Sequence, residues 1–426
     1  MIILQCDGLK MEGKNKIKTK LRETEIGKIS EEWEELRISE VCDITSSKRI
    51  FLKEYVKSGI PFYRSKEIIL KANNNEIVSP LFITEEKYQE IKTKFGVPQE
   101  GDILLTSVGT LGIPYCIGVN EIFYFKDGNL TWFKDYKDNL NNRFLLYWLR
   151  SPLAKRQVEM IAIGSTQRAL TIDALKKMVI CIPKYDEQCR IVEILSDLDF
   201  KIELNNKMNK TLETIGQAIF RHWFVDFEFP NNEGKPYKSS GGEMVDSELG
   251  EMPKGWFVGP LGGIMDVASG RRPGNKSDER DSHFCIPLIG ASSVMGYVKE
   301  SLCNERILVI GRVGTHGIVQ RIMPQSFPSD NTLIIKSRFY EYTYQILKTI
   351  NYHSLNVGTT QPLITQSSIK NLRAAIPPES ILKQFERTVS PLFKKVNDNN
   401  NETEILSDIR DSLLSRLMSG RIRVKF

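Results

Sequence analysis

Apolar residues recur at alternating steps of four and three positions along two long stretches of this chain. The first stretch follows Asp186 and the second follows Ser380, 194 residues later, and both residues are suited to capping a helix. The seam positions are Ile191, Leu195, Leu198, Ile202 and Asn205 in the first stretch, and Phe385, Val389, Leu392, Val396 and Asn399 in the second. Either stretch alone is more typical of a helix in a globular core. Their match in seam, cap and polar position predicts instead that the two helices pair as an antiparallel coiled coil.

Two features of these helices carry further expectations. Gly216 and Arg410 occupy seam positions, which predicts looser packing where they lie. Gly420 is a typical helix stop. In an antiparallel pair the tail after Gly420 should end near the segment that leads to Trp33.

The globular parts of the chain also repeat. Residues 24–33 resemble residues 247–256 at an offset of 223, and residues 164–167 resemble residues 358–361 at an offset of 194. Between these anchors, Asp127-Gly-Asn129 resembles Ser329-Asp-Asn331. The shift in offset means that the first copy is longer between the anchors, and the chain reads as a tandem duplication of one globular domain and one long helix.

Strand-like runs that end in glycine turns and amphipathic helical runs alternate within each copy. The predicted fold class is therefore two mixed α/β globular domains, separated by long helices, in a pseudo-two-fold tandem repeat. The predicted segments are a flexible leader (1–20), a first domain (21–185), a central helix (186–225), a linker (226–255), a second domain (256–378), a C-terminal helix (379–419) and a tail (420–426).

Composition narrows the class of protein. The chain has 426 residues, of which 41% are hydrophobic and 26% charged, as in globular proteins. No apolar run has the roughly 18 residues that span a bilayer, so no membrane partner is expected. The seven cysteines are scattered without a Cys-x-x-Cys pair, which favours reduced thiols and a cytoplasmic location. The net charge of +6 permits a nucleic-acid partner without requiring one.

The motifs of common catalytic sites do not occur. There is no phosphate-binding Gly-x-x-x-x-Gly-Lys-Ser/Thr loop, no Gly-x-Gly-x-x-Gly after a strand and no His-Glu-x-x-His zinc motif. The one Pro-Pro pair, Pro377-Pro378, is followed by Glu379 and so does not match the turn of an amino-methyltransferase. The sequence therefore predicts a binding protein without catalytic residues, metal or cofactor.

The polar features that recur in both copies are suited to binding DNA. Small residues precede a cationic pair in each copy, glycine turns of the form Val-Gly-Thr-x-Gly recur, and glutamines follow small-residue turns, all of which suit contacts to phosphates and base edges. Arg64 is added from the divergent region, where differences in sequence reading would be expected. Any one of these turns alone is more typical of a solvated loop or a structural turn, and it is the recurrence in both copies that makes binding an equal alternative. The candidate DNA-binding residues are Ser47, Lys48, Arg49, Arg64, Ser107, Thr110, Gln167 and Arg168 in the first copy, and Ser269, Arg271, Arg272, Arg312, Thr315 and Gln361 in the second.

The order of these motifs resembles the specificity subunit of type I restriction–modification systems. The similarity lies in the openings at 24–33 and 247–256, the Gly-Ser-Thr-Gln and Gly-Thr-Thr-Gln turns, and the run Ile-Pro-Lys-Tyr-Asp-Glu-Gln-Cys-Arg-Ile-Val that enters the first helix. The second copy departs from it, because it lacks the pair Glu187-Gln188, and the contacts at the base of its helix are expected to differ.

The resemblance implies a non-catalytic protein with two target recognition domains, each reading one half of a bipartite site on double-stranded DNA. It implies that the helices set the spacing and dock two methyltransferase subunits, and that endonuclease/translocase subunits join the complex. A DNA-modifying enzyme, either a methyltransferase or a nuclease with unrecognised motifs, is the alternative, and a scaffold without a nucleic-acid role is a third. Binding of S-adenosylmethionine by the isolated chain would favour the enzyme, and salt-sensitive binding to duplex DNA would exclude the scaffold.

Overall fold

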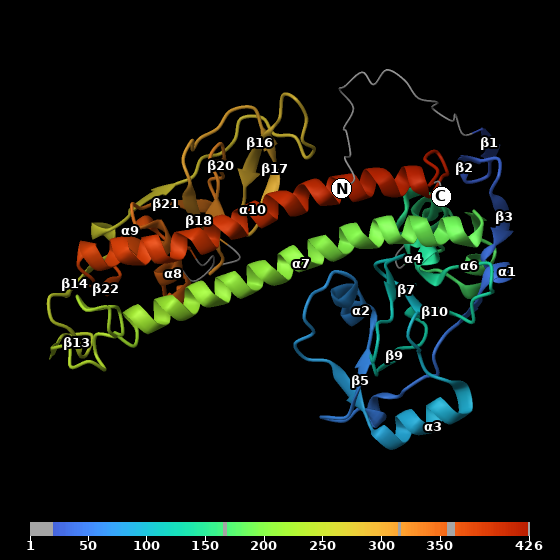
Figure 1. Ribbon diagram of the computed structural model, residues 1–426, viewed down its shortest axis with the longest axis horizontal. Coiled ribbons are helices and arrows are strands. Elements are labelled where there is room, and N and C mark those ends of the chain that lie inside the picture. Colours follow the sequence, from blue (N-terminus) through green and yellow to red (C-terminus); the bar gives the residue numbers. More distant parts are fainter. Residues whose placement is uncertain (1–19, 165–167, 314–316, 356–362, 425–426) are drawn as a thin grey trace. The chain divides into compact units, whose positions relative to one another are not determined.

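The computed structural model describes residues 20–164, 168–313, 317–355 and 363–424. The chain divides into two compact units, Met1–Asn205 with Glu402–Phe426, and Asn206–Asn401. Each unit contains one globular domain and parts of the two long helices (Figure 1). No helix within these ranges is both long enough and apolar enough to cross a membrane.

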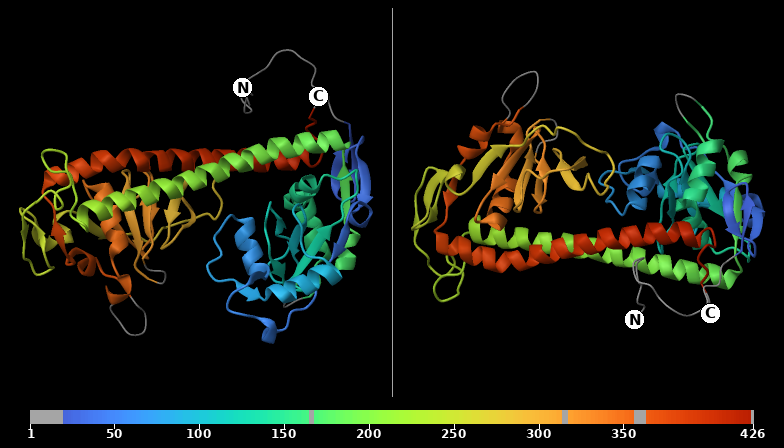
Figure 2. Two further views of the ribbon diagram at one scale, coloured as in Figure 1. Left: turned by 60° about the horizontal axis from the view of Figure 1, so that its bottom comes forward. Right: turned by 90° about the horizontal axis from the view of Figure 1, so that it is seen from above.

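The first domain is built around a four-stranded antiparallel sheet in the order β4-β10-β7-β8. Alternate residues of β7 face opposite sides of the sheet: Ile103 and Leu105 join the core that contains Trp148 of α4, and Leu104 joins the core that contains Ile68 of α2. A second sheet, β6-β5-β9, combines an antiparallel and a parallel pair. Helix α4 packs between the main sheet and the first part of α7 (Figure 2).

The first domain mixes strands and short helices, as predicted. In chain order they are β1 (Leu21–Thr24), β2 (Gly27–Ser30), β3 (Glu34–Arg37), α1 (Ile38–Val41), β4 (Asp43–Thr45), η1 (Leu52–Glu54), β5 (Ile60–Tyr63), α2 (Ser65–Ala72), β6 (Leu81–Ile83), α3 (Glu85–Phe95), β7 (Ile103–Thr106), β8 (Pro114–Cys116), β9 (Tyr124–Phe125), β10 (Leu130–Lys134), α4 (Asn142–Arg150), α5 (Pro152–Ile161), α6 (Ile172–Lys176) and β11 (Val179–Ile182).

The second domain repeats this topology. Its main sheet has the order β15-β21-β18-β19, and its second sheet, β17-β16-β20, again joins an antiparallel pair to a parallel one. Between β5 and β7 the first domain holds α2 and α3, whereas the second domain places only β17 between β16 and β18. This insertion explains most of the offset shift between the two copies.

The elements of the second domain follow the same order without those two helices. They are β12 (Met244–Val245), β13 (Met252–Pro253), β14 (Phe257–Pro260), η2 (Leu261–Gly263), β15 (Asp266–Ser269), β16 (Ile286–Ile289), β17 (Val294–Val298), β18 (Ile307–Gly311), β19 (Val319–Ile322), β20 (Phe327–Pro328), β21 (Thr332–Lys336), α8 (Tyr340–Thr349), η3 (Tyr352–Leu355), α9 (Gln366–Lys370) and β22 (Arg373–Ile376).

The long helices α7 (Tyr185–Phe224) and α10 (Glu379–Leu417) pack antiparallel, which confirms the predicted pairing. In the first unit the amide of Asn205 donates to Glu402 at 2.9 Å, and in the second unit the amide of Asn399 donates to Asn209 at 2.8 Å. Among the apolar seam residues named above, those at the base of each helix are the most deeply buried. Ile191, Leu195, Phe385 and Val389 are each 0% exposed, whereas Leu198, Ile202 and Leu392 are half-buried.

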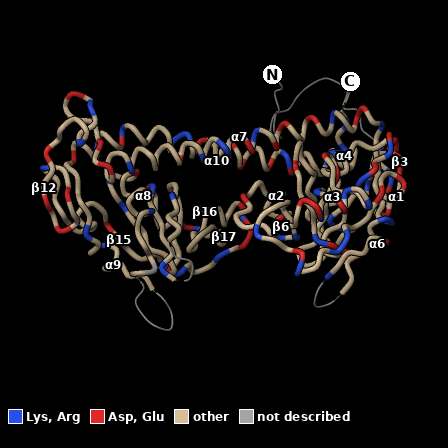
Figure 3. Tube along the Cα trace, turned by 90° about the horizontal axis from the view of Figure 1, so that it is seen from below, with Lys and Arg blue, Asp and Glu red and all other residues tan. Residues whose placement is uncertain are grey.

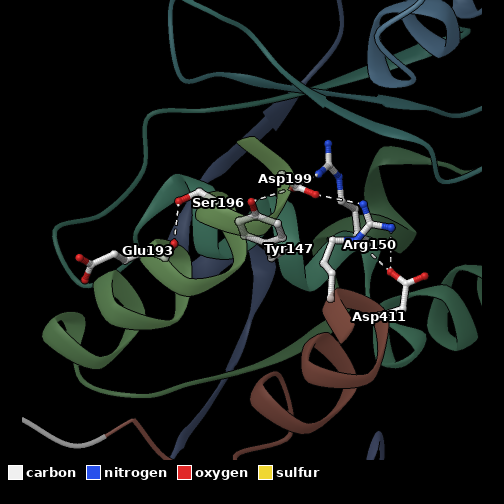
Figure 4. A network of polar contacts seen from close by, with 7 residues as sticks. Tyr147, Arg150, Glu193, Ser196, Asp199 and Asp411 are labelled. Carbon is white, nitrogen blue, oxygen red and sulfur yellow. Dashed lines mark hydrogen bonds and ion pairs between the residues drawn. The ribbon is translucent and has the colours of Figure 1, made fainter. Parts of the chain in front are cut away.

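The expectation of looser packing at Gly216 is wrong. A Cβ atom on Gly216 would lie 2.9 Å from Cε2 of Phe393, so the glycine admits an aromatic ring that any larger residue would displace. Arg410 is also fully engaged, because it forms ion pairs with Asp199 of α7 at 3.0 Å and with Asp411 at 2.9 Å. Figure 4 shows that Asp199 also accepts a hydrogen bond from Tyr147 and pairs with Arg150, so one carboxylate joins α4, α7 and α10.

The contacts at the bases of the two helices differ, as the sequence predicts. In the first unit the side chain of Gln188 accepts from the backbone N–H of Asn141 at 2.9 Å and donates to the carbonyl of Asn139 at 2.7 Å. In the second unit the carboxyl of Glu386, one turn further along α10, accepts from the backbone N–H of Tyr342 at 2.9 Å. Burial, together with the charge of Glu341, raises the pKa of Glu386 to about 7.

Glu386→Gln is expected to stabilise the second unit by about 1–3 kcal/mol at pH 8 and by little at pH 5. The folded-state pKa lies above the usual 4.5, so the stability that this group contributes is present below pH 4.5 and is lost as pH rises through about 7. Glutamine keeps the acceptor oxygen and does not ionise. Urea denaturation at both pH values measures the effect, with Asp398→Asn, on an exposed site of the same helix, as the control. An equal change at both pH values would contradict the prediction.

The tail after α10 packs against the start of the first domain, which confirms its predicted position. The backbone N–H of Ser30 donates to the carbonyl of Ser419 at 3.1 Å, and a Cβ atom on Gly420 would lie 3.1 Å from the ring of Trp33. Arg423 follows and forms a bidentate pair with Glu187 at the base of α7, at 2.6 and 2.7 Å. The second unit contains an equivalent contact, because the segment just after α7 packs on the ring of Trp256 through Phe227 and Phe229.

Candidate nucleic-acid interface

The candidate residues of the first domain gather at one end of its main sheet. Thr45, the last residue of β4, pairs with Trp132, and Thr106, the last residue of β7, pairs with Leu130, the first residue of β10. The loops after β4 and β7 and the turn before β10 therefore leave the sheet at the same end, which we call the loop end of the domain.

Backbone hydrogen bonds hold these loops together. Ser107 donates to the carbonyl of Asn129 at 2.9 Å, and Gly109 donates to that of Arg168 at 3.3 Å. The hydroxyl of Ser65 also donates to the carbonyl of Asn129 at 3.2 Å, which brings the neighbouring Arg64 to the same turn. The loop end thus unites residues that lie far apart in the sequence.

The second domain builds its loop end with the same bonds. Arg312 donates to the carbonyl of Asn331 at 2.9 Å, as Ser107 does to Asn129. Ile364 donates to the carbonyl of Arg312 at 3.0 Å, just as Leu170 donates to that of Ser107 at 2.8 Å. The backbone is therefore conserved between the two copies while the side chains that it presents differ.

Most cations at the first loop end are held by carboxylates. Nε of Arg49 lies 2.9 Å from Asp127, Nη2 of Arg64 lies 2.6 Å from Glu67, and Nη1 of Arg168 lies 2.7 Å from Glu159. Burial disfavours the charge on Glu67, but the hydrogen bonds from Arg64 outweigh burial and lower the pKa of Glu67. The ammonium of Lys48 lies 4.8 Å from the centre of the Phe95 ring.

The hydroxyl candidates of the first domain differ in exposure. Ser107 is 2% exposed and its hydroxyl is 2.6 Å from that of Thr131, so it braces the loop from within. Ser47 is buried as well, at 8% exposed, whereas Thr110 is exposed at the tip of its turn. Of the three hydroxyl candidates Ser47, Ser107 and Thr110, Thr110 is thus the exposed one.

Among the described residues, the arginines at the second loop end are held by fewer carboxylates than those at the first loop end. Arg271 and Arg272 are exposed, and within the described part of the chain neither forms an ion pair. Arg312 is half-buried and its Nη1 lies 3.4 Å from the hydroxyl of Ser269. The described ranges contain no group of three His, Cys, Asp or Glu residues that could hold a metal ion.

Comparisons with known proteins agree with this arrangement. The sequence profile of the type I restriction modification DNA specificity domain matches residues 30–214 and 253–406, which is most of the chain. The chain belongs to this family of specificity subunits. The specificity subunit is the non-catalytic member of its system, and the comparisons thus favour the predicted family over the alternative of a DNA-modifying enzyme.

Individual relatives extend the match over the full length. The specificity subunit of the type I restriction enzyme MjaIX from Methanocaldococcus jannaschii is 29% identical over 96% of this chain and 97% of its own. The HindI specificity subunit from Haemophilus influenzae is 25% identical over 76% of this chain and 87% of its own. A crystal structure of a type I S subunit from M. genitalium shares the fold, with a TM-score of 0.57 and 17% identity over 90% of this chain and 96% of that one.

The structure of the specificity subunit places most candidate residues and adds others. Gln167, Thr315 and Gln361 lie outside the described residues. Sequence reasoning missed Asp127 and Glu159, the carboxylates that hold Arg49 and Arg168, and Tyr124, whose hydroxyl accepts from the backbone N–H of Lys48 at 2.7 Å. The repeated anchor at residues 127–129 was the available signal for Asp127, but its partner lies 78 positions away.

Proposed function

We propose that this specificity subunit reads a bipartite site on double-stranded DNA, using the loop end of each domain for one half. The observation that carries the proposal is the repeated loop end: equivalent backbone bonds present different side chains, as two different half-sequences would require. Exposed Lys48 and Arg49 in one copy, and Arg271 and Arg272 in the other, supply the cations that contacts to phosphates and base edges need.

The long helices complete the proposal. They set the number of unread base pairs between the two half-sites, and they dock two methyltransferase subunits, through which endonuclease/translocase subunits join the complex. Mapping methylated bases in cells that hold this chain and its methyltransferase partner tests the reading function. We expect two short defined sequences separated by a spacer of fixed length. Methylation at a continuous site, or at no defined sequence, would refute a bipartite reader.

Arg272→Ala is expected to act on the half-site of the second domain alone. If Arg272 contacts a base, its loss should weaken specific binding by about 1–3 kcal/mol; if it contacts phosphate, the slope of log affinity against log salt should fall by about one. Titrations with the assembled methyltransferase at several salt concentrations separate these cases. Asp330→Asn, which changes an exposed residue outside the candidate set, is the control. Unchanged affinity and unchanged slope would remove Arg272 from the interface.

Exposed apolar side chains on the helices of the first unit support the proposed docking role. Charges of both signs alternate along α7 and α10 (Figure 3), yet Phe200 is 67% exposed, Leu204 is 42% exposed and Ile405 is 60% exposed. Phe200 and Leu204 are one turn apart on α7, and Ile405 is one turn from Glu402, which bonds to Asn205. Large apolar side chains gathered among charges are typical of a surface that a protein partner covers.

Phe200→Ser combined with Ile405→Ser should weaken the binding of at least one methyltransferase subunit by about tenfold or more, because both changes remove apolar area from the contact. Sedimentation of the mixed subunits measures the loss. Lys394→Ser is the matched control, since Lys394 occupies the position of Phe200 in the repeat and is exposed. Equal association of the control and the double variant would place the docking surface elsewhere.

A further inference from the structure

Arg49 has the most exposed side chain among the first-domain arginines that a carboxylate holds at the loop end. Its Nε donates to Oδ2 of Asp127 at 2.9 Å, while the side chain as a whole is 69% exposed and that of Asp127 is 18% exposed. The carboxylate is therefore fixed in the domain surface and the guanidinium extends from it towards solvent.

The two backbone segments that carry this pair are tied to each other. The hydroxyl of Ser46 donates to the carbonyl of Leu130 at 3.3 Å and accepts from the backbone N–H of Gly128 at 3.4 Å. Gly128 has a φ of +72°, a conformation that favours glycine and that turns the chain into β10. The positions from which Arg49 and Asp127 extend are thus set by the turn itself.

The geometry leaves one edge of the guanidinium available. With Nε occupied by the carboxylate, the outward N–H groups of Nη1 and Nη2 form a planar pair of donors. Such a pair matches the O6 and N7 acceptors of guanine in the major groove, which is the commonest specific arginine contact. The neighbouring carboxylate also repels phosphate, so the pair favours a base edge over the DNA backbone.

Residues next to Arg49 suit the same role. Phe51 is 56% exposed and Leu52 is 83% exposed, so the loop presents apolar surface directly beyond the arginine. Apolar side chains of this kind contact the methyl group of thymine or the sugar edge in a groove. The segment from Lys48 to Leu52 therefore combines a positive charge, an oriented donor pair and an apolar tip.

The described part of the second domain contains no equivalent of this pair. The anchors Asn129 and Asn331 align Asp127 with Ser329, which is 1% exposed and carries no charge. Arg271 and Arg272 are not held by a carboxylate in any ion pair of the described residues. Among the described residues, Arg49 is thus an exposed arginine held by a carboxylate, and its counterparts Arg271 and Arg272 are not.

We infer that Arg49, positioned by Asp127, reads a guanine in the half-site of the first domain. The inference rests on the proposed function, and it makes Asp127 a specificity-determining residue although its carboxylate need not touch DNA. It also predicts that the two half-sites differ in how they are recognised, with an arginine held by a carboxylate in one and arginines that no described carboxylate holds in the other.

The test compares Arg49→Lys, Asp127→Ala and Asp127→Asn, each assembled with the methyltransferase partner, by mapping methylated sites and by measuring DNA affinity at several salt concentrations. Lysine lacks the planar fork of donors and has no Nε–H for Asp127 to hold, so Arg49→Lys should lose between fivefold and about 150-fold of the preference for guanine at one position. The other half-site and the spacer should not change. Asp135→Asn, which alters an exposed aspartate paired with Lys134 in the chain segment after β10, is the control and should retain the full preference.

Asp127→Ala gives the sharper signature. It should lose preference at that same guanine and keep or increase overall affinity, because a freed arginine gains phosphate contacts and a negative charge is gone. Asp127→Asn should fall between it and the native chain, since an amide oxygen still accepts from Nε. A merely structural aspartate would instead lower affinity for all sequences alike.

The outcomes separate this inference from the proposed function. A photo-crosslinker at the exposed Thr110 identifies which half-site the first domain contacts. If the native chain marks a bipartite site but Arg49→Lys keeps its preference in that half, the inference fails and the proposed function stands. If Arg49 contacts phosphate instead, Arg49→Lys, which keeps the charge, should lower affinity slightly and equally for all sequences with an unchanged salt slope, and that outcome also overturns the inference. If the native chain marks no bipartite site, the proposed function itself fails.

Discussion

A chain shortened by one heptad in each long helix is expected to mark sites whose spacer is about three base pairs shorter. The proposed role of the helices as the element that sets the spacing leads to this result. Helix α7 has 40 residues and α10 has 39. At about 1.5 Å per residue, removal of seven residues shortens a helix by roughly 10 Å. One base pair advances the DNA axis by about 3.4 Å.

The two deletions must match, because the helices are antiparallel. Asn209 donates to Asn400 at 2.7 Å, and Gly216 lies against Phe393, so residues 207–213 of α7 face residues 396–402 of α10. Deleting these two segments removes Asn209, Asn399 and Asn400 together, and Asn205, which loses Glu402, keeps Thr403 as an acceptor. A step of seven also keeps the apolar seam in phase.

The recognition loops are untouched by this change, so both half-sequences should stay the same. The measurement is the sequencing of methylated sites in cells that carry the shortened chain and the methyltransferase. Deletion of residues 207–213 alone is the control, and it should break the pairing and lower solubility, because the seam of α10 loses its partner. An active double deletion with an unchanged spacer would show that something other than this helix pair sets the distance.

The helices and the repeat were predictable because each depends on spacing along the chain. Heptad positions such as Ile191 and Phe385 reveal themselves by periodicity, and the anchors near Trp33 and Trp256 by direct comparison of the two copies. The family was predictable for the same reason, since its short motifs recur in a fixed order. The heptad pattern could not reveal that the ring of Phe393 packs against Gly216. A glycine at a seam position is compatible both with a gap in the packing and with a large side chain from the partner helix that fills it.

The burial and the interaction partners of each candidate side chain could not be predicted from the sequence. Ser107 and Thr110 lie in one motif, but Ser107 is buried against Thr131 and Thr110 is exposed. Arg49 and Arg272 occupy matching positions in the two copies, but among the described residues a carboxylate pairs with Arg49 and none pairs with Arg272. These differences arise from turns that bring Asp127 or Ser329 to the loop end, and they depend on contacts between residues far apart in the chain.

Arg423→Ala is expected to lower the free energy of unfolding of the first unit by about 3 kcal/mol, the largest single-residue effect that we predict. The side chain of Glu187 is 7% exposed, and both its oxygens accept from Arg423, at 2.6 and 2.7 Å. The same guanidinium reaches Glu32 at 2.7 Å and the hydroxyl of Ser30 at 3.3 Å. Removal of the Arg423 side chain leaves the buried carboxylate of Glu187 without a counter-ion and removes the contact between the tail and the base of α7.

A second substitution distinguishes the effect of losing the ion pair with Glu187 from the effect of losing the packing of the Arg423 side chain. In a chain that already carries Glu187→Gln, no buried charge is stranded, so Arg423→Ala should cost about 1 kcal/mol. Arg421→Ala is the matched control, because Arg421 is exposed two positions earlier in the same tail. Urea denaturation of the full-length chain, followed by tryptophan fluorescence, measures all four variants. If Arg423→Ala unfolds at the same urea concentration as Arg421→Ala, the ion pair with Glu187 does not stabilise the first unit.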